Sequence, residues 1–279
     1  MKWDKLRTIC GLQIGRRKEE QFSDSGITKS HEFIQSKMPS FFRPTVGCQN
    51  VRLGLDCDGG YIVDGQSVDK ADFLLSFGIN DDWSFERDFL KRNKVEVVAF
   101  DGSIGVHWFL KRWVKHPRET LLHGAKFFDY LRFLSGRSRH VPLFVGAKQS
   151  KSHIAFAEIV TNYLPKQFQS VFLKIDIEGD EYIILDDIVA IGPRISGLVI
   201  EFHDIPKHLQ VIEEFIAKLP LSLCHVHANN NANLLDGGIS EVVEITFTRF
   251  GTELDNLAFV PNSLDRPNNK SFPEIQIVF

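Results

Sequence analysis

Short apolar runs alternate with amphipathic segments along the chain from about residue 71 onward. Seven runs rich in β-branched and aromatic residues are too short for buried helices, so they predict strands. These runs are 73–77, 95–100, 141–146, 171–176, 195–202, 221–226 and 241–250. Between them, apolar residues recur at helical spacing in 83–93, 153–164, 182–191 and 206–219. This alternation predicts an α/β fold with a doubly wound, seven-stranded, mostly parallel sheet.

The same pattern divides the chain into three parts. A weak helical pattern near residues 31–34 ends at Pro39 and Pro44, and Gly59-Gly60 between two short apolar runs predicts a hairpin turn. We therefore expect an N-terminal extension with a hairpin over residues 1–68, an α/β domain over residues 69–250 and a C-terminal tail over residues 251–279.

Charge is distributed unevenly along the chain. The 279 residues carry a net charge of −3, yet residues 107–140 contain eight Lys and Arg against Glu119 and Asp129, so the remainder carries −9. Seven aromatic residues are interleaved with these basic residues, namely Trp108, Phe109, Trp113, Phe127, Phe128, Tyr130 and Phe133. The segment predicts either a partly mobile lid that faces anions or a solvated helical face, and both interpretations stay open.

The N-terminal run Ile9–Gly15 is too short and too polar for a signal peptide or a membrane span. The four cysteines, Cys10, Cys48, Cys57 and Cys224, show no spacing typical of a zinc site or a disulfide framework. We therefore expect a cytoplasmic protein without stable membrane insertion.

Acidic residues stand at the end of the strand predicted over 171–176. Asp176 and Glu178 directly follow an apolar run, and in an open parallel sheet ligands bind beyond the carboxyl ends of the strands. A simpler interpretation is that Glu178, Asp180 and Glu181 favour the positive end of the next helix dipole. We accept that for Asp180 and Glu181, but Asp176 belongs to the strand end itself.

Gly78 follows the first predicted strand of the α/β domain, and Asp101 follows the second, one βαβ unit later. In such units a glycine lets the first loop approach the ligand, and an acid after the second strand can accept both ribose hydroxyls. A dinucleotide fingerprint has three glycines, whereas Gly78 stands alone. The pattern therefore predicts a nucleoside ligand without a pyrophosphate.

Ionisable residues also stand at the ends of the next two predicted strands, with Glu201 and His203 at the end of 195–202 and His225 and His227 at the end of 221–226. Carboxylates with imidazole suit Mg²⁺, Mn²⁺ or a similar divalent cation. Without a metal, the same side chains would act as a general base and as hydrogen-bond partners of a substrate. A lone buried histidine usually completes a hydrogen-bond network, which is the simpler interpretation of His225.

Six blocks of sequence carry a resemblance to a known family: 76–78 (Ser-Phe-Gly), 84–86 (Ser-Phe-Glu), 99–101 (Ala-Phe-Asp), 173–179 (Leu-Lys-Ile-Asp-Ile-Glu-Gly), 199–203 (Val-Ile-Glu-Phe-His) and 225–230 (His-Val-His-Ala-Asn-Asn). Over roughly residues 51–250 the chain resembles the FkbM-type methyltransferases, a branch of the class I S-adenosylmethionine-dependent methyltransferases. The resemblance implies a Rossmann-like seven-stranded sheet, S-adenosylmethionine as methyl donor, and methylation of a hydroxyl on a sugar or natural product.

The resemblance also implies roles for single residues at matching positions. Gly78 would lie in the cofactor loop, Asp101 would bind the ribose and Asp176 would lie beside the methyl group. The residues expected to bind the cofactor are Phe77, Gly78, Glu86, Asp101 and Gly146. The residues expected in catalysis are Asp176, His203 and His227, and those expected to hold a divalent cation are Asp176, Glu201 and His203.

Our interpretation of the sequence is an O-methyltransferase with a small-molecule or glycan acceptor, which the basic segment suggests to be anionic. A nucleic-acid methyltransferase is an alternative, because basic residues mixed with aromatic ones suit a nucleic acid, although no Asn-Pro-Pro-Tyr motif for base methylation is present. A nicotinamide-dependent oxidoreductase is disfavoured by the missing glycines. A Rossmann-like protein that binds a partner without catalysis is the remaining alternative.

Overall fold

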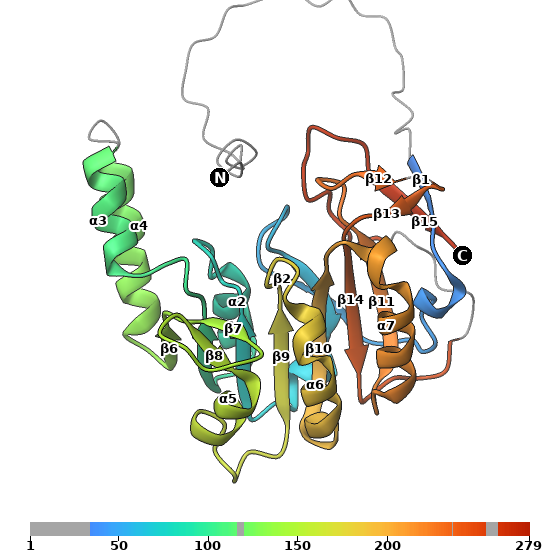
Figure 1. Cartoon of the computed structure of the whole chain (residues 1–279), viewed down its shortest axis with the longest axis horizontal. Helices are drawn as coiled ribbons and strands as arrows, with labels where there is room; N and C mark the ends of the chain where they lie inside the picture. The colour runs from blue at the N-terminus through green and yellow to red at the C-terminus, as the bar shows by residue number, and fades with distance from the viewer. Residues whose placement is uncertain (1–33, 116–119, 236, 255–261) are drawn as a thin grey trace, which may run out of the picture.

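The computed structural model describes residues 34–115, 120–235, 237–254 and 262–279, and its centre is a seven-stranded sheet (Figure 1). In spatial order the strands are β11 (Ser222–Ala228), β14 (Val243–Thr248), β10 (Ile195–Phe202), β9 (Val171–Ile175), β4 (Phe73–Phe77), β5 (Glu96–Phe100) and β6 (Ser138–Val141). Neighbouring strands are parallel, except that β14 is antiparallel to both β10 and β11. The strand order leads outward from β4 on one side and from β9 on the other, so the topological switch point lies between them. The predicted Rossmann-like, doubly wound sheet is confirmed.

Helices cover both faces of this sheet, as a doubly wound fold requires. The helices that pack on it are α1 (Gly65–Asp69), α2 (Ser84–Arg92), α5 (Phe156–Asn162), α6 (Leu185–Ile191) and α7 (Ile205–Lys218). Successive strand residues point to opposite faces. Leu173 therefore lies in the core under α5, α6 and α7, whereas Phe172 lies in the core under α1, α2 and the hairpin that precedes them.

The prediction that residues 141–146 form a strand of the central sheet is wrong. Its place is taken by β6, which lies within the basic segment, while β7 (Phe144–Gly146) pairs with β8 (His153–Ala155) outside the sheet. Pro142 separates β6 from β7, and proline cannot donate a hydrogen bond to a sheet ladder. Because β6 is the edge strand, it tolerates Arg139 and His140 and lacks the apolar run that marks a buried strand.

The basic segment forms a helical hairpin of α3 (Val106–Lys115) and α4 (Thr120–Leu134), with residues 116–119 outside the described part of the chain. The side chains of Phe109, Tyr130 and Phe133 are buried and pack against Trp83. Several aromatic residues that the sequence suggested for a surface therefore form a small core of their own. No helix in the described part of the chain is long and apolar enough to cross a membrane.

The segments before and after the α/β domain also contribute small sheets. The predicted hairpin is present, with β2 (Asn50–Leu53) antiparallel to β3 (Tyr61–Asp64). β1 (Ile34–Lys37) is parallel to β15 (Ile275–Val278), so the two ends of the described chain lie side by side (Figure 1). The remaining short elements are η1 (Ser40–Phe42), η3 (Glu181–Ile184), η4 (Gly192–Arg194), β12 (Leu234–Leu235) and β13 (Ile239–Ser240). Most of the weak helical pattern near residues 31–34, and the run Ile9–Gly15 with Cys10, lie outside the described residues.

Asp64 fastens the β2–β3 hairpin to the sheet. Its carboxylate is fully buried and accepts hydrogen bonds from the backbone N–H groups of Gln66 and Ser67. The hydroxyl of Thr248 in β14 also donates to it, at 2.6 Å. One carboxylate thus joins the hairpin, α1 and the sheet, and it holds Tyr61, in the same strand, over the sheet.

We expect Asp64→Ala to lower the free energy of unfolding by about 3 kcal/mol, because it leaves several buried donors without an acceptor. Asp69→Ala is the matched control, since Asp69 forms an ion pair with Arg92 near the surface and such pairs contribute about 1 kcal/mol or less. Urea unfolding followed by circular dichroism measures both changes. An equal loss in the two variants would contradict the anchoring role of Asp64.

Candidate active site

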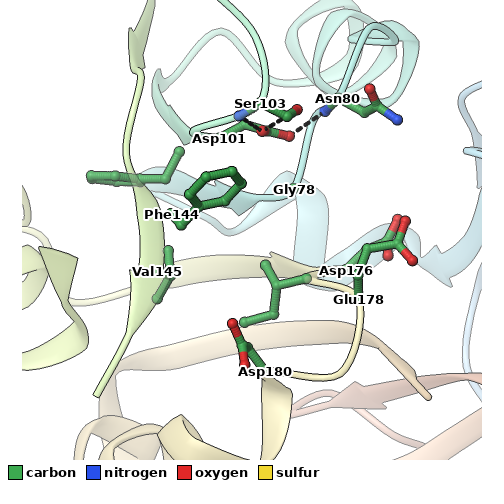
Figure 2. A pocket seen from close by; sticks show the side chains of 11 residues that line it. Gly78, Asn80, Asp101, Ser103, Phe144, Val145, Asp176, Glu178 and Asp180 are labelled. Atoms are coloured by element: carbon green, nitrogen blue, oxygen red, sulfur yellow. Dashed lines mark hydrogen bonds between the residues drawn. The ribbon is translucent and has the colours of Figure 1, made fainter. Parts of the chain in front are cut away.

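A cavity of about 230 Å³ opens at the carboxyl edge of the sheet, beside the topological switch point (Figure 2). The loops that follow β4, β5 and β9 meet there, and β7 forms one wall. The lining residues are Gly78, Asn80, Phe100, Asp101, Ser103, Phe144, Val145, Asp176, Ile177, Glu178 and Asp180. In an open α/β sheet this is where ligands bind.

Gly78 allows two loops to approach each other closely at the floor of the cavity. Its φ of +78° suits glycine, and a Cβ atom there would lie 1.6 Å from the backbone oxygen of Asp176. The Gly78 carbonyl accepts a hydrogen bond of 2.7 Å from the Nζ atom of Lys174. The first loop is therefore held against β9 by its backbone and has no room for a side chain.

Asp101 organises the loops on the opposite side of the cavity (Figure 2). Its Oδ2 atom accepts from the backbone N–H of Asn80 at 2.6 Å, and its Oδ1 atom accepts from the N–H and hydroxyl of Ser103 at 2.7 and 2.6 Å. A carboxylate has about four acceptor positions. One position on Oδ2 remains, so Asp101 has room for one ligand hydroxyl rather than for the two that the sequence pattern suggests.

Phe144 supplies a flat apolar surface to the same cavity. A Cβ atom on Gly102 would lie 2.4 Å from the Phe144 ring, so the glycine lets the ring lie directly against the loop that follows β5. Val145 and Ile177 extend this apolar wall. A planar ring with an attached hydroxylated sugar therefore has a complementary surface between Phe144 and Asp101.

The charge of the cavity is one-sided. Its lining includes the carboxylates of Asp101, Asp176, Glu178 and Asp180, and no lysine or arginine is among its lining residues. Such a lining attracts a cationic ligand and repels a pyrophosphate. The cavity therefore disfavours a dinucleotide cofactor on electrostatic grounds, in agreement with the lone glycine of its first loop.

Asp176, Glu201 and His203 come together at the edge of this cavity. Ile175 of β9 pairs with Ile200 of β10, so the residues that follow them lie side by side on one face of the sheet. The atoms that the three side chains offer as ligands all lie within 4.8 Å of one another. The sequence-predicted metal ligands are thus brought together, and Asp176 also lines the cavity.

Tyr61 of the β2–β3 hairpin bridges the two carboxylates of this group. Its hydroxyl lies 3.0 Å from Oδ2 of Asp176 and 3.1 Å from Oε2 of Glu201. Burial, reinforced by the charges of Asp176 and Glu244, raises the pKa of Glu201 well above its usual range. Burial and the same negative charges also raise the pKa of Tyr61, which therefore stays protonated as a donor.

His203 is held by acids on several sides. Its Nδ1 atom lies 3.0 Å from Oε1 of Glu181, and its Nε2 atom lies 3.8 Å from Oε1 of Glu201. Burial opposes the charged imidazolium, but the hydrogen bond to Glu181 and the charges of Glu201, Glu181 and Asp176 outweigh it and raise the pKa of His203 to about 10. In the protein alone, His203 is therefore a cation at neutral pH.

Lys174 is a site residue that the sequence patterns do not assign, although a lysine inside an apolar strand is itself a signal. Its side chain is buried, and Nζ lies 3.6 Å from Oδ2 of Asp176. Burial opposes its charge, but Asp176, Glu86 and Glu201 outweigh that effect and raise the pKa of Lys174. Asn229, which donates to Glu201 at 2.9 Å, is a second such residue.

Three of the residues expected to bind the cofactor are not among the lining residues. Phe77 is fully buried in the core with its ring under α5, and Glu86 is buried on α2, where it accepts a hydrogen bond from the hydroxyl of Ser76. Gly146 stands next to Val145, which does line the cavity. Of the expected set, Gly78 and Asp101 are the two that the cavity contains.

His227 lies outside the Asp176 group, in a buried network of its own. Its Nδ1 atom is 3.2 Å from Glu244 and its Nε2 atom is 3.1 Å from Glu274. Carboxylates accept hydrogen bonds, so both ring nitrogens donate and the ring is a cation. This engagement leaves no free nitrogen for a substrate, which argues against the expected catalytic role. His225 likewise contacts an acid, at 3.1 Å from Asp265.

No protein-family model matches the sequence, and no curated protein matches it. Among solved structures, an rRNA methylase from Streptococcus thermophilus is similar over 68% of this chain and 92% of its own, at 13% identity and a TM-score of 0.37. A precorrin-6y C5,15-methyltransferase from Geobacter metallireducens GS-15 is similar over 67% and 85%, at 14% identity and a TM-score of 0.36. The 23S rRNA methyltransferase ErmE is similar over 69% of both chains, at 11% identity and a TM-score of 0.36.

The Rossmann-like fold rests on its strand order and on the position of its switch point. The resemblance to FkbM-type enzymes stays a prediction. The function proposed below is argued from the geometry and charge of the site.

The His227 network predicts a pH dependence of stability. Burial opposes the charge of His227, but Glu244 and Glu274 outweigh it and raise its pKa well above the usual value of about 6.5. A raised pKa in the folded state adds stability that is complete below about pH 6.5 and is lost as the pH rises toward the folded-state pKa. Relative to His227→Gln, the wild type should be more stable by about 3 kcal/mol at pH 6.

That difference should shrink by up to about 1.4 kcal/mol per pH unit between pH 6.5 and 9, as urea unfolding at each pH measures. His107→Gln, on the exposed face of α3, should change stability by less than about 0.5 kcal/mol at pH 6. A difference between wild type and His227→Gln that grows with pH would show that the network does not hold a charged His227.

Proposed function

We propose that the chain is an S-adenosylmethionine-dependent O-methyltransferase that acts on a hydroxyl of a sugar, glycan or other small molecule and uses a divalent cation. One observation carries the proposal: Asp176 belongs both to an acidic, ring-lined cavity and to a compact group of two carboxylates and an imidazole. A cofactor in the cavity and an acceptor over that group would therefore meet at Asp176.

The cavity residues fit S-adenosylmethionine in shape and charge. Phe144 offers a surface for the adenine ring, and Asp101 has one acceptor position left for a ribose hydroxyl. Asp176, Glu178 and Asp180 would complement the positive sulfonium and ammonium groups. When bound, the cofactor supplies an electrophilic methyl group. The protein would hold that methyl group in line with an acceptor oxygen.

Asp176, Glu201 and His203 would hold the cation, because oxygen and imidazole donors suit Mg²⁺ and Mn²⁺. When bound, the cation would lower the pKa of an acceptor hydroxyl. Tyr61 and Asn229 hydrogen-bond to these carboxylates and would orient them, as partners beyond the ligands commonly do. Tyr61 is thus a positioning residue.

The proton of the acceptor hydroxyl needs a base within reach. In the protein alone His203 already carries its proton, and Glu201 has a raised pKa. Asp176 is the carboxylate of the group that also lines the cavity, so it is the best placed of the three to accept the proton. We therefore assign the base to Asp176, while His203 would give up its proton on binding the cation, as a metal-binding imidazole must.

RNA is the second acceptor class, because a ribose hydroxyl would need the same chemistry. The basic α3–α4 hairpin favours it, yet three of the hairpin's aromatic side chains are buried and unavailable to stack on bases. The small-molecule acceptor remains the main proposal, and an assay with total RNA beside a panel of sugars and glycans distinguishes the two classes.

For the cofactor, we expect Asp101→Ala to weaken binding of S-adenosylmethionine by about 10- to 150-fold, the loss of one charge-assisted hydrogen bond. Isothermal titration calorimetry measures it without an acceptor. Asp187→Ala, at an exposed position on α6, is the matched control and should bind as the wild type does. Equal affinity in all three proteins would place the cofactor elsewhere.

For the metal, we expect calorimetry to show Mn²⁺ binding to the wild type that Asp176→Asn and His203→Gln each weaken by at least about tenfold. Treatment with EDTA should abolish methyl transfer while cofactor affinity stays unchanged. The same assays on Asp186→Asn, at an exposed position on α6, control for a general loss of charge.

Activity that survives EDTA but falls by about 10²- to 10⁴-fold in Asp176→Asn would leave Asp176 as a general base without a metal. Methyl transfer that persists in both Asp176→Asn and His203→Gln would refute the assignment of the active site.

A further inference from the structure

Exposed apolar side chains are concentrated on the α3–α4 hairpin. Of the fourteen large apolar side chains that are exposed in the described part of the chain, seven lie on these two helices. They are Val106, Leu110, Val114, Leu121, Leu122, Phe128 and Leu131. Monomeric proteins rarely gather such residues on one element unless it contacts a partner or a membrane.

The exposed face of α3 carries two parallel stripes. Val106, Leu110 and Val114 recur every four residues and form an apolar stripe, and His107, Lys111 and Lys115 follow at the same interval one position later. At about 100° per residue, the basic stripe lies directly beside the apolar one. No acidic residue occurs in α3. A helix with adjacent apolar and lysine stripes is typical of one that lies in a membrane interface.

Exposure is greatest at the tip of the hairpin. Val114, near the end of α3, is 83% exposed, and Leu121, near the start of α4, is 89% exposed. The tip projects away from the body of the protein on the side where the central strands end (Figure 1). The aliphatic residues at the tip are thus free of contacts that would cover them within the described chain.

Two basic residues of the α3–α4 hairpin form ion pairs with Asp81, in the loop that follows β4. Lys126 lies 2.7 Å and Arg112 lies 3.6 Å from Oδ2 of Asp81. No ion pair joins Lys111 or Lys115 to an acid within the described residues. Lysines without an ion-pair partner among the described residues therefore lie along the same face as the apolar stripe.

We propose that the α3–α4 hairpin binds the surface of an anionic lipid bilayer, with its apolar stripe at the acyl boundary and its lysines at the phosphates. A second copy of the chain is a poorer occupant, because lysine stripes would face each other across a shared interface. A nucleic acid is also poorer, because aliphatic side chains do not stack on bases and the hairpin buries much of its aromatic surface. The proposal does not depend on the proposed enzyme activity.

Sedimentation of the full chain with vesicles tests the proposal. We expect binding to vesicles of equal phosphatidylcholine and phosphatidylglycerol and little binding to pure phosphatidylcholine. Lys111→Gln with Lys115→Gln should weaken binding to the anionic vesicles by about 30-fold, since each lysine near the surface contributes about fivefold. Leu110→Gln, Val114→Gln and Leu121→Gln combined should weaken it by at least about tenfold, because the apolar surface no longer inserts.

Val211→Gln with Leu235→Gln is the matched control, since these exposed apolar residues lie outside the hairpin, and its binding should equal that of the wild type. Circular dichroism and urea unfolding on each variant verify that the fold is intact. Three results would overturn the proposal: equal binding to neutral and anionic vesicles, hairpin variants that bind as the control does, or hairpin variants that instead lose self-association in sedimentation velocity or lose binding to RNA.

Discussion

Carboxylates set side by side at the edge of a buried sheet are the constraint on which this structure depends. Asp176, Glu201 and Glu244 stand on adjacent strands, and Glu201 pairs directly with Glu244 across the β10–β14 ladder. Removing such charges from water is costly unless each is paired and hydrogen-bonded. Each acid therefore has a partner from another part of the chain: Tyr61 contacts both Asp176 and Glu201, Asn229 contacts Glu201, and His227 contacts Glu244.

This requirement explains why segments on both sides of the α/β domain are built into the site. The β2–β3 hairpin brings Tyr61 to the acids and is itself held by the buried carboxylate of Asp64. The C-terminal segment brings Glu274 to His227 and Asn268 to Glu244, and its last strand pairs with β1. The acidic edge of the sheet is thus stabilised by the parts of the chain that surround the Rossmann-like core.

The two electrostatic regions of the molecule are separate in space. Acids line the cavity at the switch point, whereas exposed lysines lie on α3 of the hairpin that extends beyond it (Figure 1). The acidic cavity suits a cationic methyl donor, and the basic hairpin suits an anionic surface. If both proposals hold, the hairpin would bring the carboxyl edge of the sheet toward a membrane, where acceptors attached to lipids are concentrated.

The sequence by itself determined the sheet and the loops that form the cavity, because buried parallel strands must be apolar runs and their ligands must lie after them. Gly78, Asp101, Asp176, Glu201 and His203 were recognisable for that reason. The edge strand β6 was missed because an edge strand needs no apolar run. Tyr61 reaches Asp176, and Lys174 reaches Gly78, only through contacts across long sequence separations. His227 shows the same limit, since its type and spacing suited catalysis while Glu244 and Glu274 occupy both of its nitrogens. Only the tertiary structure decides which polar side chains are left to bind a ligand. The partners that pair with a buried charge come from distant segments of the chain, and no local sequence pattern shows which segments will pack together.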